Sequence, residues 1–319
     1  MPSAARDPSG AAAPVPGVPR TESLLSIEDP AAVARLVAAQ FPRWAALPVT
    51  AVDSDGTDHV MHRLGADMVV RLPRGDWAAD QVEKEQRWLP RLAPGLPLAV
   101  PVPLALGAPV ADCPRPWSVY RWLDGRDATV ERLADPDLTA IQLAGFLGGL
   151  RRIDAGGGPP PGPHNGRRGE PLERRDRITR EAIGALRGIV DAEAATTVWD
   201  AALRAPVWQG PPVWVHGDLR TGNLLETGGR LSAVIDFGCL AVGDPACDLA
   251  VAWALLTAGA RPVLRDALAV DAAMWARGRG WALSTGVVHV AAYLESAPEL
   301  TGSALRQVGE VLADFGHGG

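Results

Sequence analysis

Apolar residues recur at helical spacing in several stretches of the chain. Asp29 and Pro30 form a capping residue followed by proline, which is typical of a helix start, and apolar residues then return every three or four positions over 33–41. A second Asp-Pro pair, at 135–136, begins a helical stretch that runs to about Ile153 and ends in a segment rich in glycine and proline. The pattern predicts one early and one central helix.

A third helical pattern begins at Asp76, and Pro90 is expected to end or kink it. One position in its apolar stripe is charged. Glu85 shares a face with Val82, whereas Glu83 points well away, because successive helix residues turn by about 100°. An inward-facing carboxylate is costly unless it is paired, so the pattern predicts an ion pair at Glu85.

Strand patterns are short and dominate the first part of the chain. Residues 51–60 hold the turn-rich string DSDGTD between apolar edges and indicate a hairpin, while MVVRL at 68–72 and WSVYRWL at 117–123 are typical of strands. Further strand patterns stand at 213–215, 224–225 and 231–235. The first portion is therefore strand-rich and the second helix-rich, with a boundary near Asp124.

The length and these elements predict an α+β fold of two lobes. At 319 residues the chain exceeds the usual span of a single small core. We expect a first lobe over 25–123 and a second over 124–319. Residues 1–24 are rich in alanine, proline and glycine and are expected to form a disordered tail. Prolines interrupt any apolar stretch that could serve as a signal peptide, so a cytoplasmic protein is expected.

The composition is that of a globular protein and argues against two classes of partner. Hydrophobic residues make up 47% of the chain and the mean hydropathy is +0.03. The net charge of -6, from 31 basic and 37 acidic residues, argues against binding to nucleic acid, which needs clustered positive charge. The longest apolar run, 249–260, is far shorter than the roughly 20 residues of a membrane-spanning helix. Three cysteines without paired spacing predict reduced thiols and no zinc site.

The stretch VWVHGDLRTGNLLETGGRLSAVIDFG holds the most informative chemistry. Four residues separate Asp218 from Asn223, and Asp236 follows a predicted hairpin and precedes Phe237 and Gly238. The spacing places two carboxylates and an amide oxygen on adjoining loop and strand ends. Such oxygen ligands suit Mg²⁺, which also keeps phosphate oxygens and waters in its shell. Phosphoryl transfer needs positioning, charge neutralisation and one carboxylate that orients the acceptor hydroxyl, and these residues supply them.

The spacing H-x-D-x-x-x-x-N followed by D-F-G is that of kinases. Over roughly 51–293 the chain resembles the protein-kinase-like aminoglycoside phosphotransferase family, whose members commonly have HGD at this place. The resemblance implies an N-terminal antiparallel sheet lobe with one main helix and a larger, mostly helical C-terminal lobe. It also implies ATP and Mg²⁺ as cofactors, Asp218 as the catalytic carboxylate, and Asn223 and Asp236 as metal ligands. His216 would brace the loop.

Two residues after the catalytic aspartate, Arg220 lies where many protein kinases keep a lysine that touches the transferring phosphate. A solvent-facing loop arginine is the alternative. The string GDPACDLAVAW is similar to strings that follow D-F-G in the family. By that similarity Asp244 would begin a helix, and Asp248 would buttress the catalytic loop by hydrogen bonding.

The resemblance also implies a nucleotide site. Arg71 takes the place of the usual strand lysine, and Glu85 is its partner. Lys84, the one lysine of the chain, lies on the predicted helix and cannot be the strand cation. Gly56 and Thr57 would cradle phosphate through backbone amides, although the loop has a single glycine. Because arginine is not equivalent to lysine at a two-pronged site, a purely structural pair of Arg71 with Glu85 stays open.

Three consecutive residues would form the hinge whose backbone meets adenine, namely Arg121, Trp122 and Leu123. The resemblance thus predicts a kinase that moves the γ-phosphate of ATP to a hydroxyl of a small molecule. Related folds phosphorylate aminoglycosides, macrolides, choline, homoserine and sugar adducts, and kinship of fold does not choose among them. Antibiotic resistance is a hypothesis that rests on the family name.

Two other functions stay open. A nucleotide-binding regulatory protein is suggested by Arg71 and the poor glycine loop, and metal-dependent hydrolysis is less favoured because no two-metal cluster accompanies the acids. Substrate choice is assigned to the loop or lid at Gly156–Pro171 and to helices near Trp275–Glu295. The arginines around this loop are interpreted as a solvated helix face rather than as phosphate or substrate contacts. They are Arg167, Arg168, Arg174, Arg175, Arg177 and Arg180.

Overall fold

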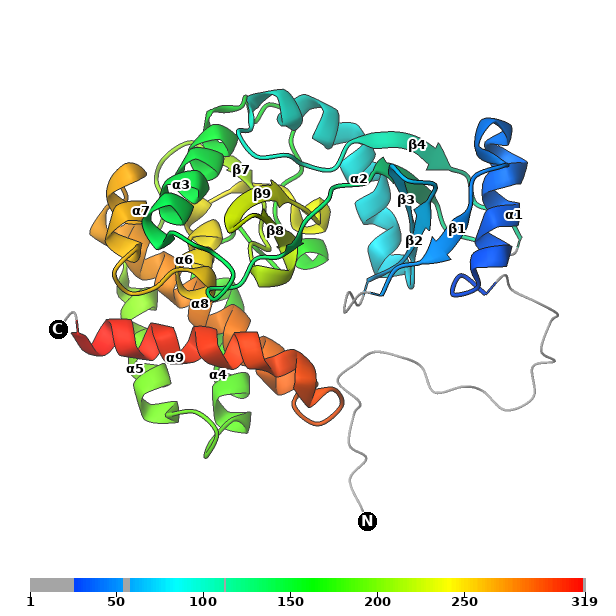
Figure 1. Ribbon diagram of the computed structural model, residues 1–319. Coiled ribbons are helices and arrows are strands. Elements are labelled where there is room, and N and C mark those ends of the chain that lie inside the picture. Colours follow the sequence, from blue (N-terminus) through cyan, green and yellow to red (C-terminus); the bar gives the residue numbers. More distant parts are fainter. Residues whose placement is uncertain (1–25, 54–57, 112, 318–319) are drawn as a thin grey trace, which may run out of the picture.

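The computed structural model describes residues 26–53, 58–111 and 113–317. The tail expected at 1–24 and the residues expected to cradle phosphate, Gly56 and Thr57, lie outside these ranges. Figure 1 shows a sheet lobe at one end of the molecule and a larger helical lobe at the other. This is the two-lobed α+β architecture expected from the sequence.

The first lobe is built on a five-stranded antiparallel sheet with the strand order β1-β2-β3-β5-β4. Its strands are β1 (Val49–Ala51), β2 (His59–Leu64), β3 (Met68–Pro73), β4 (Pro103–Gly107) and β5 (Trp117–Arg121). Side chains alternate between the faces because a strand repeats every two residues. In β3, Val70 and Leu72 therefore belong to the apolar cluster on one face of the sheet, and Val69 belongs to the cluster on the other face. Arg71 lies on the same face as Val69.

Each face of this sheet is covered by a helix (Figure 1). Helix α1 (Pro30–Gln40), capped by Asp29, packs on the side of Val70. Helix α2 (Asp76–Leu92) lies on the other side and buries its predicted stripe, Glu85 included. Pro90 does not end this helix, which runs two residues further. The proline lies in the last turn, where its missing N–H removes one hydrogen bond at most.

The second lobe is organised around α8 (Ala272–Tyr293), which is buried on most of its circumference. Its glycines allow close packing, because a Cβ at Gly278 would lie 2.7 Å from the Cβ of Leu249. The other helices are α3 (Pro136–Arg152), α4 (Asp176–Ala185), α5 (Ala192–Arg204), α6 (Val251–Leu255), α7 (Arg261–Ala267) and α9 (Gly302–His317). Of these, α4, α5, α6 and α9 contact α8. None of the helices in the described part of the chain is long and apolar enough to cross a membrane.

Two small antiparallel sheets carry the loops of the site. The first pairs β7 (Val213–Val215) with β10 (Ala241–Gly243), and the second has the order β6-β8-β9. Its strands are β6 (Arg126–Asp127), β8 (Leu224–Thr227) and β9 (Arg230–Val234). The segments that follow β7 and β9 lie side by side, since Ile235 N donates to Asn223 O at 2.9 Å. The predicted D-F-G and H-G-D segments are thereby brought together.

Candidate active site

The buried carboxylate of Asp248 binds the backbone of the loop that follows β7. Asp248 accepts hydrogen bonds from the backbone N–H groups of His216, at 2.8 Å, and Gly217, at 2.7 Å. The His216 ring bonds to the carbonyl of Ile235 through Nε2 and accepts from Asp218 N through Nδ1. These contacts are the bracing that the sequence predicted for His216 and Asp248, and they fix the backbone beside Asp218.

A glycine is required within this loop. Gly217 has a φ of 86°, in the left-handed region, and a Cβ there would lie 2.7 Å from the carbonyl oxygen of Cys239. Side chains other than glycine would meet both backbone strain and a steric clash. Gly217 therefore allows the H-G-D loop to pass closely over the residue that follows D-F-G.

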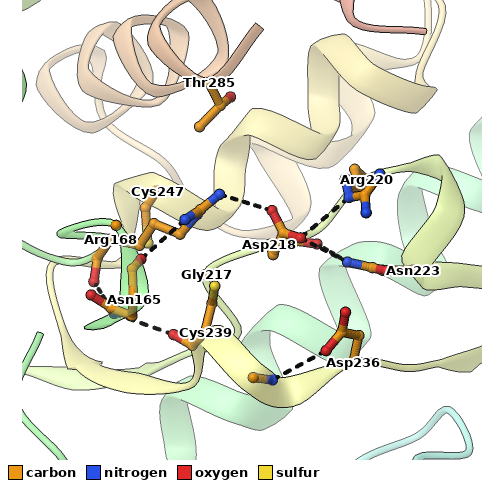
Figure 2. A network of polar contacts seen from close by, with 12 residues as sticks. Asn165, Arg168, Gly217, Asp218, Arg220, Asn223, Asp236, Cys239, Cys247 and Thr285 are labelled. Atoms are coloured by element: carbon orange, nitrogen blue, oxygen red, sulfur yellow. Dashed lines mark hydrogen bonds and ion pairs between the residues drawn. The ribbon is translucent and has the colours of Figure 1, made fainter. Parts of the chain in front are cut away.

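Three side chains bind the carboxylate of Asp218 (Figure 2). Arg168 Nη2 lies 3.0 Å from Oδ1, while Arg220 Nε lies 3.2 Å and Asn223 Nδ2 2.9 Å from Oδ2. Burial raises the pKa of Asp218, but the charges of Arg168 and Arg220 outweigh it and hold the pKa below its usual value. The group is therefore an anion at neutral pH. It is suited to orienting a hydroxyl and receiving its proton late in a reaction.

Asn223 and Asp236 are the residues that could hold a metal ion. Figure 2 shows their side chains beside Asp218 around one region. The two hydrogen bonds of Asn223 to Asp218 use the amide nitrogen, which leaves the amide oxygen as a ligand. Among the described residues no group of three or more His, Cys, Asp or Glu is arranged for a metal. A site with one amide and one carboxylate oxygen fits Mg²⁺, which retains waters and takes phosphate oxygens.

Glu85 joins the sheet lobe to the D-F-G segment. Its Oε2 accepts from Arg71 Nη1 at 2.9 Å and from the Tyr120 hydroxyl at 2.6 Å, and its Oε1 accepts from Phe237 N at 2.9 Å. Arg71 also reaches Asp236 Oδ1 at 3.4 Å. Burial lowers the pKa of Arg71, but the charges of Glu85 and Asp236 raise it by more. The pKa therefore lies above its usual value, and the guanidinium stays charged. The ion pair predicted from the helix face is present.

Lys84 and Trp122 have further contacts in this region. Lys84 does lie on the helix, as its position in the pattern predicted, and its ammonium donates to the carbonyl oxygen of Gly238. At the expected hinge, Trp122 N donates to Asp67 O at 2.8 Å, and the indole donates to Asp124 at 2.8 Å. The Arg63 guanidinium stacks on this indole 3.9 Å from its centre. The roles of Arg121, Trp122 and Leu123 toward a nucleotide stay predictions.

The interpretation of the arginines near 167–180 as a solvated face is wrong for two of them. The side chains of Arg174 and Arg177 are 69% and 84% exposed, as expected. Arg175 is instead buried, and Arg168 is only 20% exposed and lies in a turn, not in a helix. The sequence offered one signal, the glycines at 166 and 169 that flank Arg168 and mark a turn.

This fold and this arrangement of acids define a kinase-like enzyme that transfers phosphoryl groups to small molecules. The chain belongs to the phosphotransferase enzyme family, the APH family, whose model matches residues 48–281. No curated protein matches the chain.

Solved structures of similar fold include aminoglycoside and macrolide phosphotransferases. The GDP and kanamycin complex of APH(2")-IIia is 19% identical, with a TM-score of 0.70 over 88% of this chain and 98% of that one. The macrolide 2'-phosphotransferase MphH from Brachybacterium faecium is 23% identical, with a TM-score of 0.56 over 88% and 98%. The streptomycin-ATP-APH(2")-IIa complex is 18% identical, with a TM-score of 0.57 over 88% and 95%. At these identities the likeness establishes the fold.

Proposed function

We propose that the protein is an ATP-dependent, Mg²⁺-dependent kinase that phosphorylates a hydroxyl group of a small molecule. The observation that carries this proposal is the placement of Asp218, Asn223 and Asp236 around one region, beside a buried pair of Arg71 with Glu85. Bound Mg²⁺, held by Asn223 and Asp236, would neutralise charge on the phosphate oxygens.

The remaining groups of the site fit the steps of phosphoryl transfer. The acceptor oxygen forms a bond to the γ-phosphorus while the bond from that phosphorus to the β–γ bridging oxygen breaks, so that ADP leaves. The hydroxyl proton passes to the carboxylate of Asp218. Arg220, on Oδ2 of that carboxylate, is suited to the γ-phosphate, and Arg71 to the phosphates nearer the ribose.

The acceptor is proposed by class only. The matched structures include complexes with kanamycin, gentamicin and streptomycin, as well as macrolide enzymes. We propose a hydroxylated acceptor, either an antibiotic of these kinds or a metabolite, and we propose ATP over GTP as the donor to be tested first. If the protein confers resistance, its expression in a sensitive host raises the inhibitory concentration of the drug that it modifies, and unchanged susceptibility argues against that role.

The direct test is phosphate transfer from Mg-ATP and Mg-GTP to a panel of hydroxylated acceptors. Asp218→Asn should lower kcat by at least roughly a hundredfold, the usual effect of a positioned acid or base. Asp200→Asn is the matched control, because this carboxylate is 40% exposed and lies on α5 in a surface pair with Arg180. Undiminished activity of Asp218→Asn would remove the basis of the proposal.

A catalytically weak regulatory protein is the second candidate. The observation that favours it is the arginine at position 71, which pairs with Glu85 where protein kinases have a strand lysine. Tight binding of Mg-ATP with no turnover on any acceptor would support this candidate over the kinase.

A further inference from the structure

Arg168 binds a different oxygen of the Asp218 carboxylate from the other two side chains. Both Arg220 and Asn223 bind Oδ2, whereas Arg168 Nη2, at 3.0 Å, is the one donor to Oδ1 among the residues that the structure describes. A carboxylate offers about four acceptor positions, two on each oxygen. The position that remains for an acceptor hydroxyl is therefore on Oδ1, directly beside the guanidinium of Arg168.

The turn that carries Arg168 is tied to the D-F-G segment. Asn165 is fully buried, and its amide donates to Arg168 O at 2.9 Å and to Cys239 O at 3.2 Å. Its amide oxygen accepts from Gly162 N at 3.0 Å. The guanidinium of Arg168 donates back to Asn165 O at 3.1 Å. The turn thus links the carboxylate of Asp218 with the residue next to D-F-G.

The same turn is fixed to the helical lobe. Arg175 donates to Gly166 O at 2.6 Å and to the hydroxyl of Ser284, on α8, at 2.9 Å. On its other side, Gly169 O accepts from Asp244 N at 2.9 Å. Gly243 packs so closely here that a Cβ would lie 2.4 Å from Gly169 O. The part of the expected loop or lid around Arg168 is therefore held on both sides by hydrogen bonds.

We propose that Arg168 is a positioning residue, which holds the Asp218 carboxylate in one rotamer and presents Oδ1 to the acceptor hydroxyl. The proposal rests on the proposed function in one respect, that Asp218 is the group that receives the hydroxyl. Its physical basis is that a charge-assisted hydrogen bond of 3.0 Å, on a side chain 20% exposed, fixes the carboxylate plane before substrate arrives.

Arg168→Met removes the charge and keeps the apolar stem, and Arg168→Lys keeps a charge without the fork. The first measurement is the crystal structure of Arg168→Met without nucleotide. We expect the Asp218 carboxylate to rotate or to occupy more than one rotamer, while it holds one in the parent protein. A carboxylate that keeps its rotamer in this variant overturns the proposal whether or not the protein proves to be a kinase.

The second measurement is phosphate release from Mg-ATP with water as the acceptor. Arg168→Met should lower kcat about tenfold to a hundredfold, the scale of a misplaced catalytic group, while the KM for Mg-ATP stays within about twofold. The kcat of Arg168→Lys should lie between those of the parent protein and Arg168→Met. Millimolar guanidinium should restore part of the kcat of Arg168→Ala, because it can refill the space beside Oδ1.

Arg177→Met is the matched control, since that side chain is 84% exposed and, among the described residues, forms its ion pair with Glu181 on its own helix. It should leave kcat unchanged. A purely structural Arg168 predicts a lower Tm with normal kcat for the folded protein and no response to guanidinium, and that result overturns the proposal. If the parent protein transfers phosphate neither to water nor to any acceptor of the panel, the proposed function fails, and the Asp218 rotamer alone decides on Arg168.

Discussion

His59 illustrates how strongly the side of the sheet that carries Arg71 restricts the protonation of a single titratable residue. This residue is 7% exposed and its Nδ1 lies 3.4 Å from Arg71 Nη2, so the ring accepts from a guanidinium and must be neutral. Burial, and then the charges of Arg71 and Arg74, lower the pKa of His59 from 6.5 to about 2. An imidazole with this environment stays uncharged near neutral pH.

This depressed pKa makes a prediction about acid stability. Because the unfolded chain binds a proton at His59 below pH 6.5 and the folded chain does not, folding is weakened progressively as the pH falls from about 6.5 toward 2. Between pH 7 and pH 5 the loss from this one residue should be about 2 kcal/mol. Urea unfolding at several pH values measures it, and His59→Gln should lose less stability over this interval. Between pH 7.5 and 9 the unfolding free energies of the two proteins should change with pH in parallel. If they also change in parallel below pH 6.5, the assignment to His59 is contradicted.

At the scale of elements, α2 binds the D-F-G segment through two adjacent side chains. The side chain of Glu85 accepts from Phe237 N, and that of Lys84, the preceding residue, donates to Gly238 O. Burial lowers the pKa of Lys84, with partial compensation by nearby anions. The N–H of Phe237 and the carbonyl group of the next residue, Gly238, are thus both bound by one helix, which fixes Asp236 relative to the sheet lobe.

Glu85→Gln tests this contact between α2 and the D-F-G segment. Glu85 accepts three hydrogen bonds on two oxygens, and an amide has one oxygen, so at least one of the buried donors on Arg71, Tyr120 and Phe237 loses its acceptor. The free energy of unfolding should fall by about 1–3 kcal/mol, and Mg-ATP should bind more weakly. Denaturant titration and calorimetry give these two values.

Glu83→Gln is the matched control, because Glu83 lies on the same helix and is exposed. It should leave both quantities within about 0.5 kcal/mol. Equal effects of the two substitutions would show that the helix charge, and not the contact with D-F-G, is responsible.

At the scale of the whole molecule, a buried ion pair joins α8 to the segment that follows the site. Arg277 on α8 lies 2.8 Å from Asp244, and both side chains are at most 7% exposed. Arg277 also donates to Pro206 O, beyond the end of α5. Three parts of the helical lobe therefore meet at one guanidinium, next to the segment that supports Asp248.

Arg277→Met should be strongly destabilising. It leaves the carboxylate of Asp244 buried without its partner, a change that costs about 3–5 kcal/mol when one member of such a pair is removed. Thermal and urea unfolding measure this loss, with exposed Arg177→Met as the control that should stay within about 0.5 kcal/mol of the parent. A loss below about 1 kcal/mol would mean that Asp244 is compensated by other groups.

Contacts within a short stretch could be predicted from the sequence. The spacing of Asp218, Asn223 and Asp236 falls within one strand–loop–hairpin unit, and the helix period alone placed Glu85 on the inner face. The strands at 213–215 and 231–235 also matched, because apolar runs between turn residues identified them. Strands β4, β6 and β10 had no such pattern, since they are short and owe their conformation to a partner strand.

The sequence by itself determined the class of chemistry, because the acid, the amide and the second acid are held at fixed separation by local backbone. Only the tertiary structure decided which cations surround them. Arg168 meets Asp218 across 50 residues, and Tyr120 meets Glu85 across 35. A guanidinium or a hydroxyl has the same local pattern whether it faces solvent or a buried carboxylate, and its partner is chosen by the packing of the lobes.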